Sequence, residues 1–317
     1  MIFIYLTIFI LSFFILTYSS KKLVGSLTEL SKFLGWKEFV VAFFTMSLAA
    51  TIPNLSVAIS SIIHGIPQFS FSEIIGGNII DLSVTMALAV LVSKRGLRLV
   101  SRTVQGTAIF TLFLPLLPLL LVIDKELSRI DGVLLISAFV VYSTWLFSKH
   151  DRFTKVYNRA NGHMGFKKVF GHLFSILISV ILLLIAAEGI VRSATYFSIF
   201  LNLPLVLIGI LIVGPGNALP EIFFSIQAAK KGKSWMVAGN IMGAIIFPVT
   251  LVLGIVAIAS PITITDFSPF LIGRLFLVFS AVFFLVFIRS GKRITKKEAI
   301  FLLLIYILFV LAEIFFY

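Results

Sequence analysis

Apolar stretches recur along the whole sequence, and each has the ~20 residues needed to cross the hydrocarbon core of a bilayer. In lipid, every backbone polar group must be satisfied within the protein, so spans of this kind fold as helices. Only 12% of the residues are charged, whereas a soluble domain averages about 25%. The sequence therefore predicts an all-α polytopic membrane protein.

Charged runs and turn residues divide these stretches into ten predicted spans. The first has no basic segment before it and no small-residue cleavage site, so we interpret it as a spanning helix and not a signal peptide. We expect it to continue as an amphipathic helix toward residue 33. The predicted spans are residues 2–20, 37–63, 70–92, 103–123, 130–148, 173–200, 203–229, 235–260, 268–288 and 298–316.

The basic residues are distributed unevenly between the loops. Those that follow odd-numbered spans hold 22 of the 26 Lys and Arg residues. Because cytoplasmic loops carry an excess of Lys and Arg, we expect both termini on the extracytoplasmic side of the cell (plasma) membrane. Topology thus accounts for the net charge of +13, and no nucleic-acid partner is expected. The absence of cysteine excludes disulfides and thiolate metal sites.

The sequence matches itself when it is shifted by 167 positions. Segment 23–54 then lies over 190–221, so that Pro53 meets Pro220, and further on Gly76 meets Gly243. The later spans of the first half also fall on later spans of the second. We therefore predict two five-helix repeats, and their bounds are residues 1–150 and 168–317, joined by a basic cytoplasmic linker at 151–167.

An odd number of spans in each repeat places the two repeats in opposite orientations across the membrane. Inverted repeats are common in secondary transporters, whose ion sites lie near the bilayer midplane where helices are broken. The sequence has no nucleophile–base arrangement, no HExxH and no phosphate loop. We therefore expect a secondary transporter and not an enzyme, with no cofactor and no obligatory protein partner beyond the lipid bilayer.

Spans 2 and 7 carry the matching interruptions. Proline has no N–H, so Pro53 and Pro220 each leave a carbonyl four residues earlier without its helical donor. Asn54 follows the first of these prolines and Glu221 follows the second. An ionisable residue inside a span is costly and indicates a functional site.

Span 3 supplies a second carboxylate, Asp81. Hard cations prefer oxygen ligands, so we predict a cation site from two carboxylates, two amides and one hydroxyl: Glu221, Asp81, Asn54, Asn217 and Thr51. The alternatives are structural. The amides can hold helices together, Thr51 can bond back to its own helix, Asp81 can pair with a neighbouring hydroxyl, and Glu221 can face water.

Three other polar positions have simpler interpretations. Glu73 is near the outer end of span 3, where we expect a solvated helix terminus. Glu188 and Arg192 are four residues apart and are expected to pair with each other.

Two segments carry a family resemblance. GNALPEIFFSIQAAKKGKSWMVAGNIMGAIIF (216–247) and AATIPNLSVAISSIIHGIPQFSFSEIIGGNIID (49–81) resemble the paired G-x-x-x-P-E and G-N-x-x-G-S-x motifs of the cation/calcium exchanger superfamily, which includes the sodium/calcium exchangers. The resemblance implies exchange of Ca²⁺ for Na⁺ by alternating access. It assigns the key carboxylate to Glu221 and the equivalent first-half position to Asn54, an amide.

Several positions depart from the family pattern. The small hydroxyl after the motif glycine is replaced by Gly77 and Ala244, a hydroxyl before the proline by Ala218, and a polar ligand by Pro248. GNA at 216–218 is similar to proton-coupled calcium exchangers of the same superfamily. Two alternatives therefore remain open: an H⁺-coupled or other-cation exchanger of the same fold, and a transport-inactive membrane scaffold or regulatory homologue.

Overall fold

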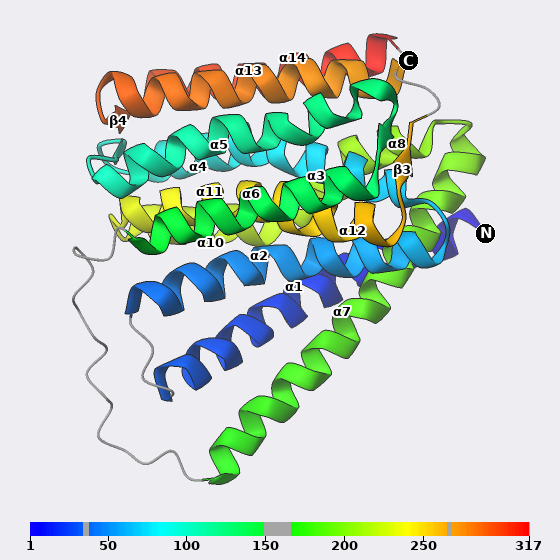
Figure 1. Ribbon diagram of the computed structural model, residues 1–317, viewed down its shortest axis with the longest axis horizontal. Helices are drawn as coiled ribbons and strands as arrows, with labels where there is room; N and C mark the ends of the chain where they lie inside the picture. The colour runs from blue at the N-terminus through cyan, green and yellow to red at the C-terminus, as the bar shows by residue number, and fades with distance from the viewer. Residues whose placement is uncertain (34–37, 149–165, 265–267, 317) are drawn as a thin grey trace.

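The computed structural model describes residues 1–33, 38–148, 166–264 and 268–316. Helices fill most of this part of the chain and form a single bundle, with both termini at the same end (Figure 1). The predicted linker at 151–167 lies outside the described residues except for its last two, which begin a helix. In the first half the helices are α1 (Ile2–Phe33), α2 (Glu38–Ile63), α3 (Pro67–Ile80), α4 (Met86–Val92), α5 (Arg102–Leu121) and α6 (Arg129–Ser148).

The second half begins with the longest helix, α7 (Phe166–Leu201), which has 36 residues. The next span is divided into three short helices, and the one after it into two. The remaining helices are α8 (Leu205–Ile208), α9 (Gly214–Asn217), α10 (Leu219–Lys230), α11 (Ser234–Phe247), α12 (Leu253–Ala259), α13 (Ser268–Ser290) and α14 (Lys296–Phe316).

The ten predicted spans coincide with these helices. Nine helical stretches within the described residues are long and apolar enough to cross a membrane. The remaining predicted span, residues 37–63, corresponds to α2, whose 26 residues extend for about 39 Å at a rise of 1.5 Å per residue. The first span continues as a helix to Phe33, as the sequence predicts. The polytopic, all-α prediction is confirmed.

Two short strand pairs join the halves of the chain. Strand β1 (Leu97–Arg98) pairs with β4 (Arg293–Ile294), and β2 (Glu126–Leu127) pairs with β3 (Ile262–Thr263). In each pair one strand comes from the first half and its partner from the second, and the pairs lie at opposite ends of the bundle (Figure 1). Two inverted repeats produce this arrangement.

The buried apolar side chains form two clusters. The larger one joins α3, α4, α5, α11, α13 and α14. The smaller one is formed mainly by α1 and α7, and includes Leu16 and Leu23 from the first helix and Leu183 and Val191 from the second. In Figure 1, α1 and α7 cross the bundle obliquely at one side. The same cluster includes Val57 of α2 and Phe69 of α3, so these two helices pack against each other and also against one face of the main bundle.

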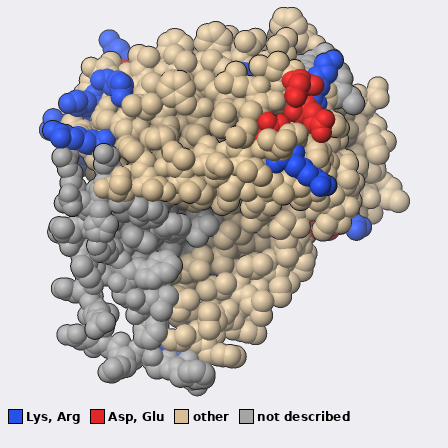
Figure 2. Space-filling model, viewed as in Figure 1, with Lys and Arg blue, Asp and Glu red and all other residues tan. Residues whose placement is uncertain are grey.

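Figure 2 shows more basic side chains at the end of the bundle where β1 and β4 pair than at the other end, where basic side chains lie beside acidic ones. The β1–β4 end is the one opposite both termini. The structure therefore keeps the separation of the basic loops from the chain ends that the sequence predicts.

Candidate cation site

The helix of span 7 is broken where the sequence predicts a break. Helix α8 runs into a π-helical turn (η4, Gly209–Val213), the single turn α9 follows, and the chain restarts as α10 at Leu219. Pro215 and Pro220 contribute no N–H groups, and Ala218, between α9 and α10, lies outside both helices. Glycines at 214 and 216 allow the close approach of α3 and of Phe13 to this stretch.

The expected break at Pro53 does not occur, because α2 is continuous from Glu38 to Ile63 with Pro53 inside it. Residues 49–51 are Ala, Ala and Thr, which lack the backbone freedom of glycine. A single proline with no glycine or second proline beside it is therefore accommodated without dividing the helix. Of the two matching prolines, only the second-half one lies at a helix break.

The following span contains a π-helical turn in each half. The first turn, η1 (Asp81–Thr85), begins at Asp81, and the second, η5 (Pro248–Val252), begins at Pro248. These two positions are 167 residues apart and are therefore register partners in the internal repeat. Single π turns inside α-helices are frequent at functional sites. Both halves thus widen the helix at the same place.

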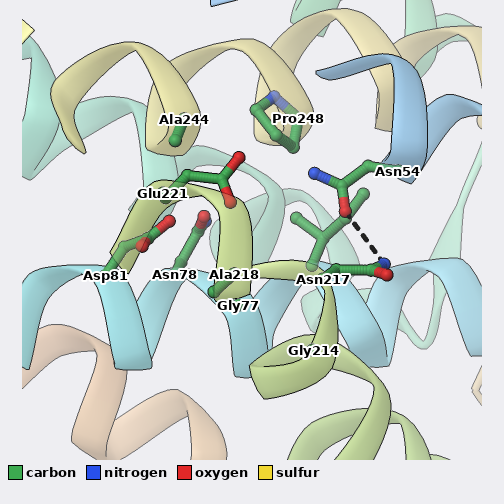
Figure 3. A pocket seen from close by; sticks show the side chains of 11 residues that line it. Asn54, Gly77, Asn78, Asp81, Gly214, Asn217, Ala218, Glu221, Ala244 and Pro248 are labelled. Atoms are coloured by element: carbon green, nitrogen blue, oxygen red, sulfur yellow. Dashed lines mark hydrogen bonds between the residues drawn. The ribbon is translucent and has the colours of Figure 1, made fainter. Parts of the chain in front are cut away.

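A small polar cavity lies where α2, α3, α9, α10 and α11 meet (Figure 3). The space open to the centre of a water-sized sphere is about 10 Å³, close to the ~10–15 Å³ needed to hold one water molecule. The cavity is therefore suited to a single small ion or water. Its lining residues are Asn54, Ile74, Gly77, Asn78, Asp81, Gly214, Asn217, Ala218, Glu221, Ala244 and Pro248.

Two carboxylates line this cavity from opposite halves of the chain. Asp81 is 4% exposed and Glu221 is 5% exposed. The side chain of Asp81 accepts a hydrogen bond from Thr85 Oγ1 at 2.9 Å, whereas Glu221 Oε2 has no hydrogen-bond partner in the described residues. The alternative in which Glu221 faces water is not supported.

Amide groups complete the polar lining. Asn217 Nδ2 donates to Asn54 Oδ1 at 3.2 Å, which joins α9 to α2 (Figure 3). The side-chain Oδ1 of Asn217 has no partner among the described residues. Behind the cavity, Asn240 Nδ2 donates to the carbonyl of Glu221 at 3.4 Å and to Ser225 Oγ at 3.2 Å. These amides fix the backbone that presents the carboxylate.

Four of the five predicted ligands therefore lie together around one cavity: Asn54, Asp81, Asn217 and Glu221. The fifth, Thr51, is 2% exposed and precedes Asn54 by about one turn of α2, but it does not line the cavity. The positions that depart from the family pattern, Gly77, Ala218, Ala244 and Pro248, do line it. The departures thus lie inside the candidate site.

Pro248 has a structural consequence that partly offsets the missing side-chain ligand. It has no N–H for the carbonyl of Ala244, four residues earlier in the same helix. Ala244 itself lines the cavity. The proline therefore leaves a backbone oxygen without its helical donor close to the two carboxylates.

Two polar residues were not predicted as site residues. Asn78 lines the cavity, and its Nδ2 has no partner within the described part of the chain. Glu73, expected at a solvated helix end, is completely buried. That expectation is wrong because α3 begins at Pro67 and packs against η4 and α9 along its length. The register partner of Glu73 is Asn240, which marks the position as one inside a packed motif.

The predicted pair at the other side of the molecule is confirmed. Arg192 Nε donates to Glu188 Oε1 at 2.6 Å. Glu188 Oε2 also accepts from Ser60 Oγ at 2.7 Å, which links α7 to α2.

Comparison with known families identifies the class of protein. The family model described as "Sodium/calcium exchanger protein" matches residues 4–148 and 171–315, which together are 290 of the 317 residues. The two matched segments are offset by 167 residues, the shift found in the sequence itself. The chain belongs to the sodium/calcium exchanger family, a family of cation antiporters of the membrane, and is an integral membrane protein.

Individual relatives are distant. The chain is 23% identical over 346 residues to the sodium/calcium exchanger MaX1 of Methanosarcina acetivorans, covering 95% of this chain and 96% of the relative. An uncharacterized membrane protein of Methanocaldococcus jannaschii is 27% identical over 237 residues, and the match covers 74% of this chain and 76% of that protein. A solved structure of the sodium-calcium exchanger NCX_Mj, soaked with Na⁺ and Sr²⁺, matches with a TM-score of 0.67 and 23% identity. The match covers 98% of this chain and 99% of that chain. This likeness shows a common fold.

Proposed function

We propose that this protein exchanges Ca²⁺ for Na⁺ across the membrane by alternating access, and that the ions bind in the cavity between α2, α3, α9, α10 and α11. One observation carries the proposal. Asp81 and Glu221, from opposite halves, are both buried at this cavity, and no salt bridge to either occurs in the described residues. Buried carboxylates are costly unless a cation or another partner compensates them.

The groups around the cavity supply oxygen ligands of the kind that Ca²⁺ and Na⁺ take. Asp81 and Glu221 contribute the negative charge, and Asn54 and Asn217 contribute amide oxygens. The carbonyl of Ala244 adds a backbone ligand. Thr51 lies one turn before Asn54. It either orients that part of α2 or binds an ion that has moved from the cavity toward it. No cofactor takes part, because the transported cations are the substrates.

The sliding unit is the pair α1 and α7. The side chain of Phe13 on α1 lies against Gly216 at the helix break, and Lys21 Nζ lies 4.5 Å from the ring centroid of Phe223 on α10. Movement of α1 and α7 past the main core would break these contacts and change which side of the membrane reaches the cavity. The apolar cluster formed mainly by α1 and α7, distinct from the larger cluster of the bundle, supports such a movement.

The domain boundaries and the orientation form part of the proposal. We place the repeats at residues 1–150 and 168–317, in agreement with the two segments matched by the family model. The basic end of the bundle faces the cytoplasm of a cell whose plasma membrane holds the protein, and both termini are extracytoplasmic. We infer no obligatory protein partner.

Binding of Ca²⁺ to the purified protein, measured by titration calorimetry, tests the site. Loss of one charge from a buried pair costs at least about 2 kcal/mol, so Glu221→Gln should weaken Ca²⁺ binding at least about 30-fold. The matched control is Glu313→Gln, which neutralises a carboxyl that is 1% exposed but outside the cavity. Equal Ca²⁺ affinity in both variants would contradict the assignment, and a wild-type protein that binds no Ca²⁺ would favour a scaffold role.

A further inference from the structure

Glu73 is a buried carboxyl that the proposed Ca²⁺ site does not use. Its side chain is 0% exposed, and no salt bridge to it occurs in the described residues. Asn217 Nδ2 donates a short hydrogen bond to Glu73 Oε2. The other carboxyl oxygen, Oε1, has no partner in the part of the chain that the structure describes, and neither has Asn217 Oδ1. Two neighbouring side chains thus each carry an uncompensated buried oxygen.

Helix packing does not explain the charge of Glu73. The backbones of α3 and α9 already touch without it, because a Cβ atom on Gly214 would lie 2.5 Å from the Glu73 carbonyl oxygen and from the Gly77 nitrogen. An amide at position 73 could keep a hydrogen bond to Asn217 without burying a charge. The register partner in the other half is an amide: Asn240 Nδ2 donates to Ser225 Oγ and to the Glu221 carbonyl.

The Glu73 carboxyl and the cavity are adjacent but distinct. Glu73 precedes Asp81 by eight residues on the same helical span, which is about 12 Å along the axis, and it does not line the cavity. Asn217 connects the two places, because its Nδ2 also donates to Asn54 Oδ1 at 3.2 Å. A change in the orientation of the Asn217 amide would therefore alter the hydrogen bonding of both the Glu73 carboxyl and the cavity.

Backbone oxygens of η4 also face α3. Pro215 offers no N–H to the carbonyls of Leu211 and Ile210, four and five residues earlier. The Ile210 carbonyl is the group that a Cβ atom on Gly76 would strike, so it lies directly against α3, one turn from Glu73. One carboxylate, one amide oxygen and one or two carbonyls form an oxygen set with a single negative charge.

We propose that Glu73 and Asn217 form a second cation-binding locus between α3 and α9, specific for a monovalent metal cation, Na⁺. The single charge matches a monovalent ion and leaves a divalent one under-compensated. When Na⁺ binds, the Asn217 amide rotates so that Oδ1 replaces Nδ2 beside Glu73, and the bond to Asn54 is released. Occupancy of this locus thereby changes the lining of the Ca²⁺ cavity. The inference rests on the proposed function in naming Na⁺ as the coupling ion.

Thermal unfolding of the purified full-length protein tests the Na⁺ locus, with choline replacing Na⁺ at constant ionic strength. An ion that binds only the folded state stabilises it by RT ln(1 + [ion]/Kd), so the melting temperature rises with the ion concentration relative to Kd. The wild type should be stabilised by Na⁺. In Glu73→Gln the Na⁺ concentration that gives the same rise in melting temperature should increase at least tenfold, while the corresponding Ca²⁺ concentration changes less than threefold. Glu73→Asn, which introduces the residue of the other half, should behave alike and carries the test if the Gln variant does not fold.

The outcomes separate this inference from the proposed function. Glu313→Gln is the matched control and should leave both ion responses unchanged. Identical Na⁺ responses in the wild type and both Glu73 variants, or no Na⁺ response in the wild type, would overturn the Na⁺ locus. Loss of the Ca²⁺ response together with the Na⁺ response would also overturn it, because Glu73 would then belong to the Ca²⁺ site. A wild type that responds to Na⁺ but not to Ca²⁺ would contradict the proposed function alone.

Discussion

At the scale of single residues, the charge of the site is carried by carboxyls that face one cavity from opposite halves of the chain. Asp81 comes from the turn η1 and Glu221 from the start of α10. Like charges in a shared, water-poor site repel one another, and a cation between them reverses the sign of that interaction. The site is therefore expected to be strained without an ion and stabilised by one.

Asp81→Asn tests this balance. Neutralising one carboxyl relieves the repulsion, so the melting temperature without divalent ions should not fall. An ion at about 100 times its Kd adds about 2.7 kcal/mol of stability, and a 30-fold weaker Kd reduces this to below about 1 kcal/mol. Thermal unfolding with and without Ca²⁺ should show the Ca²⁺-induced rise at least halved. An unchanged rise would exclude Asp81 as a ligand.

The sequence was sufficient to predict which side chains line the cavity where a proline or glycine motif marks the place. Glu221 and Asn54 follow the paired prolines, and Asp81 is a carboxylate inside an apolar span. Glu73 was misjudged because α3 is buried on nearly all sides, so the position of a residue along the helix does not indicate its exposure. Its register partner Asn240, in the G-N motif of the second half, was the signal that marked it as buried.

At the scale of elements, the two spans that follow the proline motifs contain the same structural feature, a π-helical turn. Each has a π turn that begins at a register-matched residue, Asp81 in one half and Pro248 in the other. One supplies a carboxylate, and the other removes the N–H that would bond the carbonyl of Ala244. The first half thus supplies a side-chain oxygen at the start of its π turn, and the second frees a backbone oxygen one turn earlier.

Pro248→Ala restores an amide donor to this helix. The Ala244 carbonyl then bonds within the helix, so Ca²⁺ affinity should fall roughly tenfold, the equivalent of one hydrogen-bond-like contact of about 1.4 kcal/mol. The melting temperature should rise, because an internal proline costs a helix about 3 kcal/mol. Calorimetry and thermal unfolding of the same sample measure both effects.

The control for that variant is Pro115→Ala. Pro115 is a buried proline inside α5 and does not line the cavity. Its replacement should raise the melting temperature and leave Ca²⁺ affinity unchanged. A Pro248→Ala protein that is more stable and binds Ca²⁺ as tightly as the wild type would show that the Ala244 carbonyl is not a ligand.

Element boundaries were predictable where charge and turn residues end an apolar run, and the helices begin and end near the predicted limits. The difference between α2 and the divided α8–α10 span was not. Both contain the matching proline, but only the second has glycines at 214 and 216 and an additional proline at 215. A helix breaks where several such residues act together, and one proline in each half suggested a symmetry that the backbone does not have.

At the scale of the whole molecule, two inverted halves enclose one cavity, and the helices that open each half are packed against each other. α1 and α7 supply most of the smaller apolar cluster, and α1 contacts the helix break, where Phe13 lies against Gly216. The strand pairs β1–β4 and β2–β3 fasten one half to the other at both ends of the bundle. The arrangement combines a fixed core with a helix pair that can move past it.

Ca²⁺ uptake into proteoliposomes under an imposed Na⁺ gradient tests the central claim most directly. Wild-type protein should accumulate Ca²⁺ against its gradient when Na⁺ is high inside, and uptake should reverse direction when the Na⁺ gradient is reversed. Glu221→Gln should reduce the rate to that of protein-free vesicles, whereas Glu313→Gln should not. Uptake that follows a pH gradient and ignores Na⁺, or that persists unchanged in Glu221→Gln, would contradict Na⁺-coupled Ca²⁺ exchange at this site.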